Sequence, residues 1–484
     1  MFCFYKVSLQ HKERFMLIKQ LYTGCLSEAA YYIESNGEAA IIDPLRDIDE
    51  YLELASERNA KIKYVFETHF HADFVSGHID LGKATGAPIV YGPGTETNFP
   101  VHIARDGEKF KIGELTIEVL HTPGHTLESS CYLLKDANGK DYCVFTGDTL
   151  FVGDVGRPDL AQKGDEITME DLAGMLYDSL QKKIMPLAGE VLVYPAHGPG
   201  SACGKNLGPH TYSTIGDEKA TNYALKTASK KEFIKAVTEG IGEPPQYFPI
   251  NAMINKQGYD SLDDVLQEGM KALSVDEFKN AITDDTIILD TRKETEFTKG
   301  FVPESISIGL NGRFAEWAGS LLPFDKPILL VTEPGTEKEA IIRLARVGFD
   351  TVDGYLEGGY GAWKNAGEKS DMIIDVEPDE LLMDLPFDEK LVVLDVRKPT
   401  EYADGHLPGS INLPLNDLND PANMATINDD ENVYVHCGGG YRSVIASSLL
   451  KRQGIHNLRN VLGGWDKIKE LEKVEIIKEK SVLN

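Results

Sequence analysis

The sequence predicts an α/β protein built from three successive domains. Short β-rich runs alternate with helical stretches over residues 16–258, which is the pattern of an α/β domain. Further on, residues 289–297 (LDTRKETEF) return as residues 394–402 (LDVRKPTEY), so that Asp290 recurs as Asp395 after 105 residues. A chain of 484 residues is too long for one hydrophobic core, and a repeat of this length has an ordinary domain size.

The first domain is expected to carry its chemistry at the ends of its strands. Polar clusters that contain His or Asp follow several apolar runs, and loops at strand ends commonly hold the catalytic groups of α/β enzymes. The expected strands are residues 39–42, 63–66, 115–120, 142–145 and 191–194.

Proline and glycine mark the end of this first domain. Pro244, Pro245, Pro249 and Gly258 interrupt the alternating pattern, which indicates a boundary there. We expect residues 1–15 to be an upstream extension. The predicted organisation is a first domain at 16–258, a linker at 259–271, and further domains at 272–370 and 374–478.

The repeat covers a whole domain. The same offset aligns further glycine, proline, serine and isoleucine positions, which indicates duplication of one fold. The aligned pairs are Gly300 with Gly405, Pro303 with Pro408, Ser305 with Ser410, Ile306 with Ile411, Gly358 with Gly463 and Gly359 with Gly464.

Charge and composition argue against several classes of protein. A formal net charge of −28 disfavours binding to nucleic acid or to anionic membranes, and no apolar run approaches the roughly 20 residues of a membrane span. Six cysteines without a CxxC pair do not resemble a disulfide framework, so we expect a reducing, cytoplasmic location. Any anionic substrate must find a locally positive pocket.

Four strand ends of the first domain carry side chains that can bind a metal ion. A histidine in any single polar loop is more often structural, but four such clusters at successive strand ends indicate a metal site. The clusters are His69, His71 and Asp73 in ETHFHAD, His121 and His125 in HTPGHT, Asp148 in GDT, and His197 in YPAHG.

These motifs resemble the metallo-β-lactamase superfamily, which has an αββα sandwich fold and carries an HxHxDH motif with later ligands. Phe74 stands where the last histidine of that motif would be, which disfavours a two-zinc hydrolase. Within the superfamily the chain resembles the persulfide dioxygenases, which implies one Fe(II) per chain on His69, His125 and Asp148. Two histidines and one carboxylate leave positions open for O₂ and substrate. Three neighbours would orient ligands or substrate: His71, Asp73 and His197.

Two further residues are assigned roles near the substrate. The resemblance implies that Arg157 binds the carboxylate of a thiol carrier, for which a planar guanidinium is suited. The alternative for this arginine is a surface ion pair with Asp154 or Asp159. Cys203 lies in a glycine-rich loop, and we expect it to approach the metal and to carry sulfur, although most cysteines are structural.

The last domain carries a cysteine loop between a predicted strand and a predicted helix. Three glycines in CGGGYR let backbone N–H groups form an anion-binding nest, and the helix dipole with Arg442 favours a thiolate at Cys437. The loop resembles the CxxGxR signature of rhodaneses, which implies a doubly wound α/β fold and a persulfide on the cysteine. Asp395 and Arg397 are expected to form structural pairs with neighbours such as Glu401. The persulfide loop is completed by Gly438, Gly439, Gly440, Tyr441 and Ser443.

The middle domain lacks this chemistry. The 105-residue offset places Thr332 at the position of the cysteine and Glu337 at that of the arginine. A hydroxyl does not ionise at neutral pH, and a carboxylate repels an anionic sulfur donor. We therefore expect a rhodanese-like domain that is inactive in sulfur transfer and serves as a spacer or docking module.

The resemblances together imply an enzyme that oxidises a low-molecular-weight thiol persulfide to sulfite with O₂. Sulfur held on Cys437 would then convert sulfite to thiosulfate, or the reverse, in persulfide detoxification. The expected partners are glutathione, coenzyme A or a similar thiol, O₂, and sulfite or thiosulfate, and the expected assembly is a homodimer or homotetramer. Two alternatives stay open: a zinc thioester hydrolase resembling glyoxalase II fused to a sulfurtransferase, and a sulfur carrier that does not oxidise.

Overall fold

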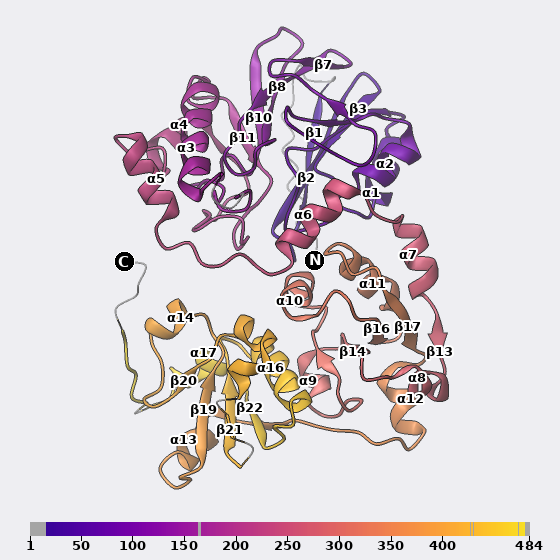
Figure 1. Ribbon diagram of the computed structural model, residues 1–484, viewed down its shortest axis with the longest axis vertical. Helices are drawn as coiled ribbons and strands as arrows, with labels where there is room; N and C mark the ends of the chain where they lie inside the picture. Colours follow the sequence, from indigo (N-terminus) through magenta and orange to yellow (C-terminus); the bar gives the residue numbers. More distant parts are fainter. Residues whose placement is uncertain (1–15, 163–165, 426, 429, 473, 480–484) are drawn as a thin grey trace. The chain divides into compact units, whose positions relative to one another are not determined.

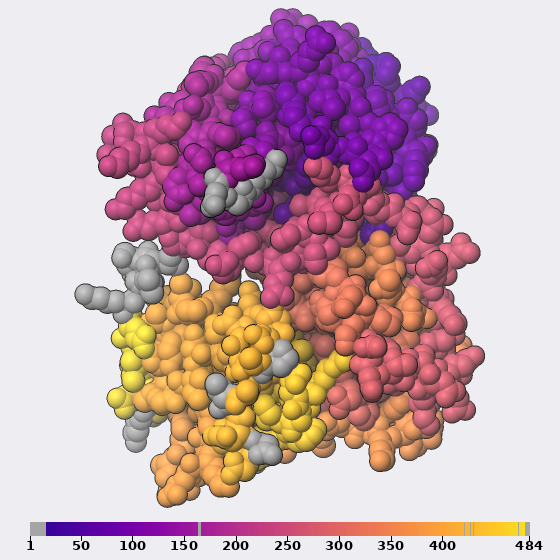
Figure 2. Space-filling view, in the orientation of Figure 1, coloured from indigo at the N-terminus to yellow at the C-terminus, as the bar shows by residue number. Residues whose placement is uncertain are grey.

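A computed structural model describes residues 16–162, 166–425, 427–428, 430–472 and 474–479 (Figure 1). The expectation for residues 1–15 lies outside this range. The chain divides into two compact units, Met1–Ser261 and Leu262–Asn484. Figure 2 gives its surface, with the first unit coloured from indigo to pink and the second from there to yellow. Among the described helices, none has the length and apolarity needed to cross a bilayer.

Two six-stranded sheets form the centre of the first unit. The first sheet has the order β1-β2-β3-β4-β5-β6 and the second β12-β11-β10-β9-β8-β7. The strands of the first sheet are β1 (Leu17–Thr23), β2 (Glu28–Ser35), β3 (Glu38–Ile42), β4 (Lys61–Phe66), β5 (Ile89–Tyr91) and β6 (His102–Ile103). Those of the second are β7 (Lys109–Ile112), β8 (Leu115–His121), β9 (Ser130–Lys135), β10 (Asp141–Gly147), β11 (Leu192–Pro195) and β12 (Ser213–Thr214).

Helices cover the outer faces of these sheets (Figure 1). They are α1 (Asp49–Glu57), α2 (His78–Thr85), α3 (Met169–Ser179) with a π-helical turn at Leu180–Ile184, α4 (Ile215–Thr221) and α5 (Lys230–Thr238). Helix α6 (Phe248–Gln257) lies instead against the loop after β4, where Asn255 donates to the carbonyls of His71 and Phe74. Successive strand residues point to opposite faces, so Tyr31 of β2 packs between the sheets while Tyr32 packs against Tyr51 of α1. On the second sheet, Leu133 of β9 likewise packs against Leu176 of α3. The predicted αββα sandwich is confirmed.

The second unit contains two five-stranded parallel sheets with the same strand order. In the first, β13-β17-β16-β14-β15, the strands are β13 (Ala272–Leu273), β14 (Ile287–Asp290), β15 (Ile306–Ser307), β16 (Ile328–Val331) and β17 (Val352–Leu356). In the second, β18-β22-β21-β19-β20, they are β18 (Ile374–Val376), β19 (Leu391–Asp395), β20 (Ile411–Asn412), β21 (Asn432–His436) and β22 (Leu458–Val461). The equal order confirms the predicted duplication of one α/β fold.

The helices of the second unit precede, connect or follow these parallel strands. The first repeat contains α7 (Leu262–Gly269), α8 (Val275–Ala281), α9 (Glu294–Phe297), α10 (Phe314–Leu321), α11 (Glu337–Ala345) and α12 (Gly359–Asn365). The second contains α13 (Pro378–Asp384), α14 (Pro399–Ala403), a 3₁₀ turn (Leu415–Asn419), α15 (Pro421–Met424), α16 (Tyr441–Arg452) and α17 (Gly464–Ile468).

The segment expected to be a linker is largely folded. Residues 262–269 form α7, and Gly269 at its end lies against Ile341 and Val352 of the second unit. Tyr259 instead packs in the first unit, where its hydroxyl donates a hydrogen bond to the carbonyl of Ser76. The helix was not predicted because Gly258 was taken as the end of the first domain and the residues after it as a connection between domains.

Candidate functional site

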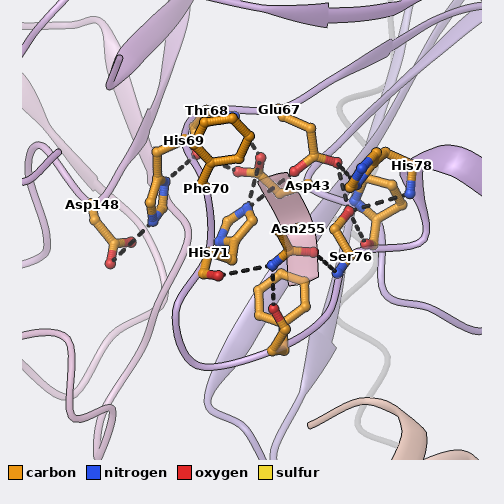
Figure 3. Close-up of polar contacts among 12 residues, drawn as sticks. Asp43, Glu67, Thr68, His69, Phe70, His71, Ser76, His78, Asp148 and Asn255 are labelled. Atoms are coloured by element: carbon orange, nitrogen blue, oxygen red, sulfur yellow. Dashed lines mark hydrogen bonds and ion pairs between the residues drawn. The ribbon is translucent and has the colours of Figure 1, made fainter. Parts of the chain in front are cut away.

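Three predicted metal ligands converge in the first unit. His69 comes shortly after β4, His125 lies in the loop after β8, and Asp148 directly follows β10. Asp148 Oδ2 lies 3.4 Å from His125 Nε2 and 3.8 Å from His69 Nε2, and no side chain of the trio is more than 1% exposed. Figure 3 shows His69 directed toward Asp148. The strand ends of two different sheets therefore deliver one buried cluster.

The donor atoms of this cluster fit a cation. Within the described part of the chain, neither His69 Nε2 nor His125 Nε2 has a hydrogen-bond partner. A buried polar atom without a partner costs about 1–3 kcal/mol. Two such nitrogens facing one carboxylate, in a buried position, are a donor set that can bind zinc or a divalent transition metal.

Hydrogen bonds on the far side of each ring fix the nitrogen that faces the cluster. Thr68 donates its hydroxyl proton to Asp43 Oδ2 at 2.9 Å, so its oxygen accepts the Nδ1 proton of His69, also at 2.9 Å. His125 Nδ1 donates to the backbone carbonyl of Arg157 at 2.9 Å. In both rings the lone pair is therefore on Nε2, as metal binding requires.

The Nε2 edge of His71 faces two carboxylates, and its ring lies 4.2 Å from that of the ligand His69 between centroids. His71 Nε2 lies 3.1 Å from Asp43 Oδ1 and 3.4 Å from Glu67 Oε2 (Figure 3). Burial lowers the pKa of His71, but the charges of Asp43 and Glu67 outweigh burial and hold that pKa well above its usual value. Burial also raises the pKa of Glu67 to about 7. Phe74, fully buried, packs against the His71 ring with 4.3 Å between centroids and 33° between the ring planes.

Two other predicted neighbours border the ligands. His197 Nε2 lies 3.4 Å from Asp73 Oδ2 and 3.5 Å from Asp148 Oδ1. The donor atoms of His71, Asp73 and His197 also lie within 4.8 Å of one another. By contrast, His121 bonds the carbonyl of Leu127 and is not part of these clusters.

No role at the site was predicted from the sequence for Asp43, Glu67 or Thr68. Asp43 immediately follows β3, and Thr68 and Glu67 immediately precede His69. The strand-end argument that selected the histidines could have selected Asp43. It was not applied because a single aspartate after a strand carries no spacing motif.

Cys203 lies at the border of the predicted metal site. Its sulfur and the donor atoms of Asp148 and His197 lie within 4.8 Å of one another. The side chain is buried, and burial raises the pKa of its thiol well above the usual value. Cys203 therefore lies close to the predicted metal ligands, as expected. Its role in carrying sulfur stays a prediction.

Arg157 is held inside the first unit by its own neighbours. Its guanidinium binds Asp159 through two hydrogen bonds of 2.7 Å, and donates to the carbonyls of Gly242 at 2.6 Å and Ala202 at 3.2 Å. The pair with Asp159 was the alternative considered, but it is buried rather than on the surface. Arg157 therefore supports the site through its carbonyl, which orients His125.

We expect Arg157→Ala to destabilise the first unit by about 3–5 kcal/mol, because Asp159 would keep a buried charge without its partner. Hydrogen–deuterium exchange around His125 measures this local loss. The chain has three tryptophans and all lie in the second unit, so tryptophan fluorescence during unfolding is an internal control that should not change. Unchanged exchange together with a tenfold higher KM for persulfide would instead support carrier binding by Arg157.

The cysteine loop of the second unit has the geometry of an anion nest. Cys437 follows β21 and is buried, and the backbone N–H of Gly440 donates to its Sγ at 3.1 Å. Gly440 has φ of +110°, a conformation that favours glycine, and caps the N-terminus of α16. Ser443 Oγ lies 3.7 Å from the sulfur. The loop therefore directs amide donors and a helix N-terminus at the cysteine.

Glu401 has a partner different from the one expected. It binds Arg442 through two hydrogen bonds of 2.6 and 2.7 Å, while Arg397 pairs with Asp395 and donates to the carbonyl of Gly405 at 2.7 Å. The expected structural pairing of Asp395 and Arg397 is present, but Glu401 pairs with Arg442 and not with these two residues. The adjoining cavity of about 430 Å³ is lined by Arg397, Glu401, Asp404, Gly438, Gly439, Arg442, Trp465 and Asp466.

The corresponding loop of the middle domain has different chemistry. Thr332 follows β16 and is buried, as Cys437 is after β21. The carboxylate of Glu337 accepts the backbone N–H of Gly335 at 2.9 and 3.0 Å. Among the described residues, this loop offers neither a thiol nor an arginine at these positions.

Comparisons with known proteins match both units. The metallo-beta-lactamase superfamily matches residues 23–197, and the rhodanese-like domain matches residues 274–366 and 377–471. A crystal structure of a metallo-beta-lactamase from Staphylococcus aureus subsp. aureus COL is 31% identical, covers 71% of this chain and 99% of its own, and has a TM-score of 0.63.

Two curated relatives match part of the chain at equal identity. Human mitochondrial persulfide dioxygenase ETHE1 is 30% identical over 224 residues, which are 46% of this chain and 80% of the relative. A probable hydroxyacylglutathione hydrolase of Schizosaccharomyces pombe is 30% identical over 183 residues, which are 37% of this chain and 66% of the relative. The chain thus spans just under two thirds of that hydrolase.

Proposed function

Because the chain belongs to the metallo-beta-lactamase superfamily and carries two rhodanese-like domains, we propose that it oxidises a small thiol persulfide with O₂ and transfers sulfur at Cys437. The observation that carries this proposal is the buried trio His69, His125 and Asp148, with both histidine Nε2 atoms free for a ligand. A relative named persulfide dioxygenase supports the same reaction.

These three residues would hold one Fe(II). When bound, Fe(II) supplies the O₂ chemistry that zinc lacks, and a facial set of two histidines and one carboxylate leaves room for two further ligands. The residues around these three orient the ligands and enclose the site. Thr68 and the Arg157 carbonyl hold the Nδ1 protons of the two histidines, and the ring of Phe74 packs against that of His71.

The second half of the reaction takes place at the cysteine loop. The Cys437 thiolate attacks the outer sulfur of a sulfur donor, the donor's S–S bond breaks, and Cys437 becomes a persulfide. An acceptor, either sulfite or a thiolate, then attacks the outer sulfur and releases the thiolate again. The N–H of Gly440 and the N-terminus of α16 stabilise the negative charge in both states.

A thioester hydrolase is the second candidate, favoured by the hydroxyacylglutathione hydrolase relatives of equal identity. Oxygen uptake with glutathione persulfide and hydrolysis of a glutathione thioester separate the two, when each is measured on iron-loaded and on zinc-loaded protein. We expect oxygen uptake by the iron form and slow hydrolysis by both. Rapid hydrolysis by the zinc form without oxygen uptake by the iron form would replace our proposal with the hydrolase.

A further inference from the structure

Tyr441, the first residue of α16, reaches out of its own domain. Its hydroxyl donates a hydrogen bond of 2.7 Å to the carbonyl of Gly309 in the middle domain. Its ring lies against Gly309 and Gly312, which we call the glycine cradle. A Cβ atom added at Gly312 would lie 2.4 Å from Cζ of the ring, and one at Gly309 would lie 3.5 Å from Cε2. A side chain at Gly312 would therefore displace the tyrosine.

The glycine cradle is itself held in place. Between its two glycines, the N–H of Leu310 donates to the carbonyl of Thr291 at 3.1 Å. The carbonyl of Leu310 accepts a hydrogen bond of 2.6 Å from Arg343 on α11. The middle domain thus presents a fixed surface to the ring.

The cradle is not a general feature of the repeated fold. The 105-residue offset places Pro414 and Asp417 of the last domain at the positions of Gly309 and Gly312. It also places Thr336 of the middle domain at the position of Tyr441. Tyrosine and glycines therefore form one asymmetric contact, in which the middle domain receives a residue of the active loop.

Other contacts fix the rest of α16 to the same domain. Ser448 Oγ accepts the backbone N–H of Ser307 in β15 at 3.0 Å. Val444 packs with Phe297 and Phe301 of the middle domain, and Figure 1 shows α16 beside α9. The helix is thus anchored along its length, and Tyr441 is the anchor nearest to the cysteine.

We propose that the middle domain positions the active loop by holding Tyr441 in the glycine cradle. Tyr441 directly follows Gly440, whose N–H donates to Cys437 Sγ, so a fixed ring fixes the first turn of α16 and the amide donors at the sulfur. A domain without a thiol thereby serves sulfur transfer as a positioning element. This inference rests on the proposed sulfur transfer at Cys437.

Tyr441→Phe removes the hydroxyl and keeps the ring, and Gly312→Ala disturbs the ring from the other domain. For each variant we expect kcat for sulfur transfer from thiosulfate to glutathione to fall about tenfold or more, with KM nearly unchanged, because small misplacements near a reacting atom are costly. The pH midpoint for alkylation of Cys437 by iodoacetamide, followed by mass spectrometry of its peptide, should rise because the thiolate loses donors.

Matched controls test whether these effects are specific. Tyr434→Phe removes a tyrosine hydroxyl that bonds Asp384 within the last domain, and Gly361→Ala adds a methyl group where no atom lies within 4 Å. Both should keep the wild-type kcat and alkylation profile. In Tyr441→Ala with Gly312→Ala the two losses should be less than additive, since no ring remains to be displaced.

A wild-type kcat and alkylation profile in Tyr441→Phe would overturn the proposal, even if Gly312→Ala fails to fold. Unfolding followed by tryptophan fluorescence should show little change in Tyr441→Phe, which distinguishes positioning from loss of structure. If the wild-type chain transfers no sulfur, the proposed function fails, and the alkylation profile still decides whether the cradle controls the thiolate.

Discussion

Asp148→Asn is expected to remove bound iron and to lower persulfide-dependent oxygen uptake by at least about 100-fold, because changes to mere neighbours of metal ligands already cost about 10- to 100-fold. The amide has the shape of the carboxylate but no charge. It would leave His69 Nε2 and His125 Nε2 facing a neutral group at the present distances of 3.8 and 3.4 Å. Metal content per chain and the rate of oxygen uptake are the measurements.

A matched variant in the same unit separates this effect from a general loss of charge. Asp106→Asn changes an exposed carboxylate that bonds Lys183, and it should keep both iron and oxygen uptake. Sulfur transfer from thiosulfate should stay at the wild-type rate in both variants, because Cys437 lies in the other unit. Full oxygen uptake in Asp148→Asn would show that this aspartate is not a ligand of the reacting metal.

The fold was largely predictable because its signals are local. Strands and their ends follow from apolar runs and the polar residues after them, and the expected strand at 63–66 lies within β4. The duplication was visible as a fixed offset of identical residues, and the two sheets share one strand order. Local patterns also placed His69, His125 and Asp148 at strand ends, but they could not give the distances between these side chains.

The hydrogen-bond and ion-pair partners of side chains were less predictable, because they depend on which distant segments the fold brings together. The partners of Arg157 include carbonyls 45 and 85 residues further along, which no local motif announces. Glu401 lies four residues from Arg397 but bonds Arg442, 41 residues away, since α16 brings that guanidinium to the same cavity. The contact of Tyr441 with Gly309 spans 132 residues and two domains. Contacts between residues this far apart form only in the folded chain and leave no local pattern in the sequence.

Cys437→Ser is expected to abolish sulfur transfer, with a loss of at least about 1,000-fold, since removal of an essential nucleophile can cost about a millionfold. Serine keeps the size and position of the side chain beside Gly440, but its hydroxyl does not ionise at neutral pH and forms no persulfide. The variant gives the last domain a hydroxyl where the middle domain already has Thr332. The two loops would then be alike in lacking a nucleophile.

Oxygen uptake with glutathione persulfide should stay at the wild-type rate in Cys437→Ser, and sulfite should accumulate without conversion to thiosulfate. Cys25→Ser, which changes a free cysteine of the first unit that is only partly buried, should behave as the wild type in both assays. Thiosulfate formation that survives in Cys437→Ser would place sulfur transfer at another thiol, and Cys203 beside the metal ligands would be the first to test. Loss of both oxygen uptake and thiosulfate formation would instead mean that the oxidation depends on Cys437. The persulfide formed on that cysteine would then be the substrate that is oxidised.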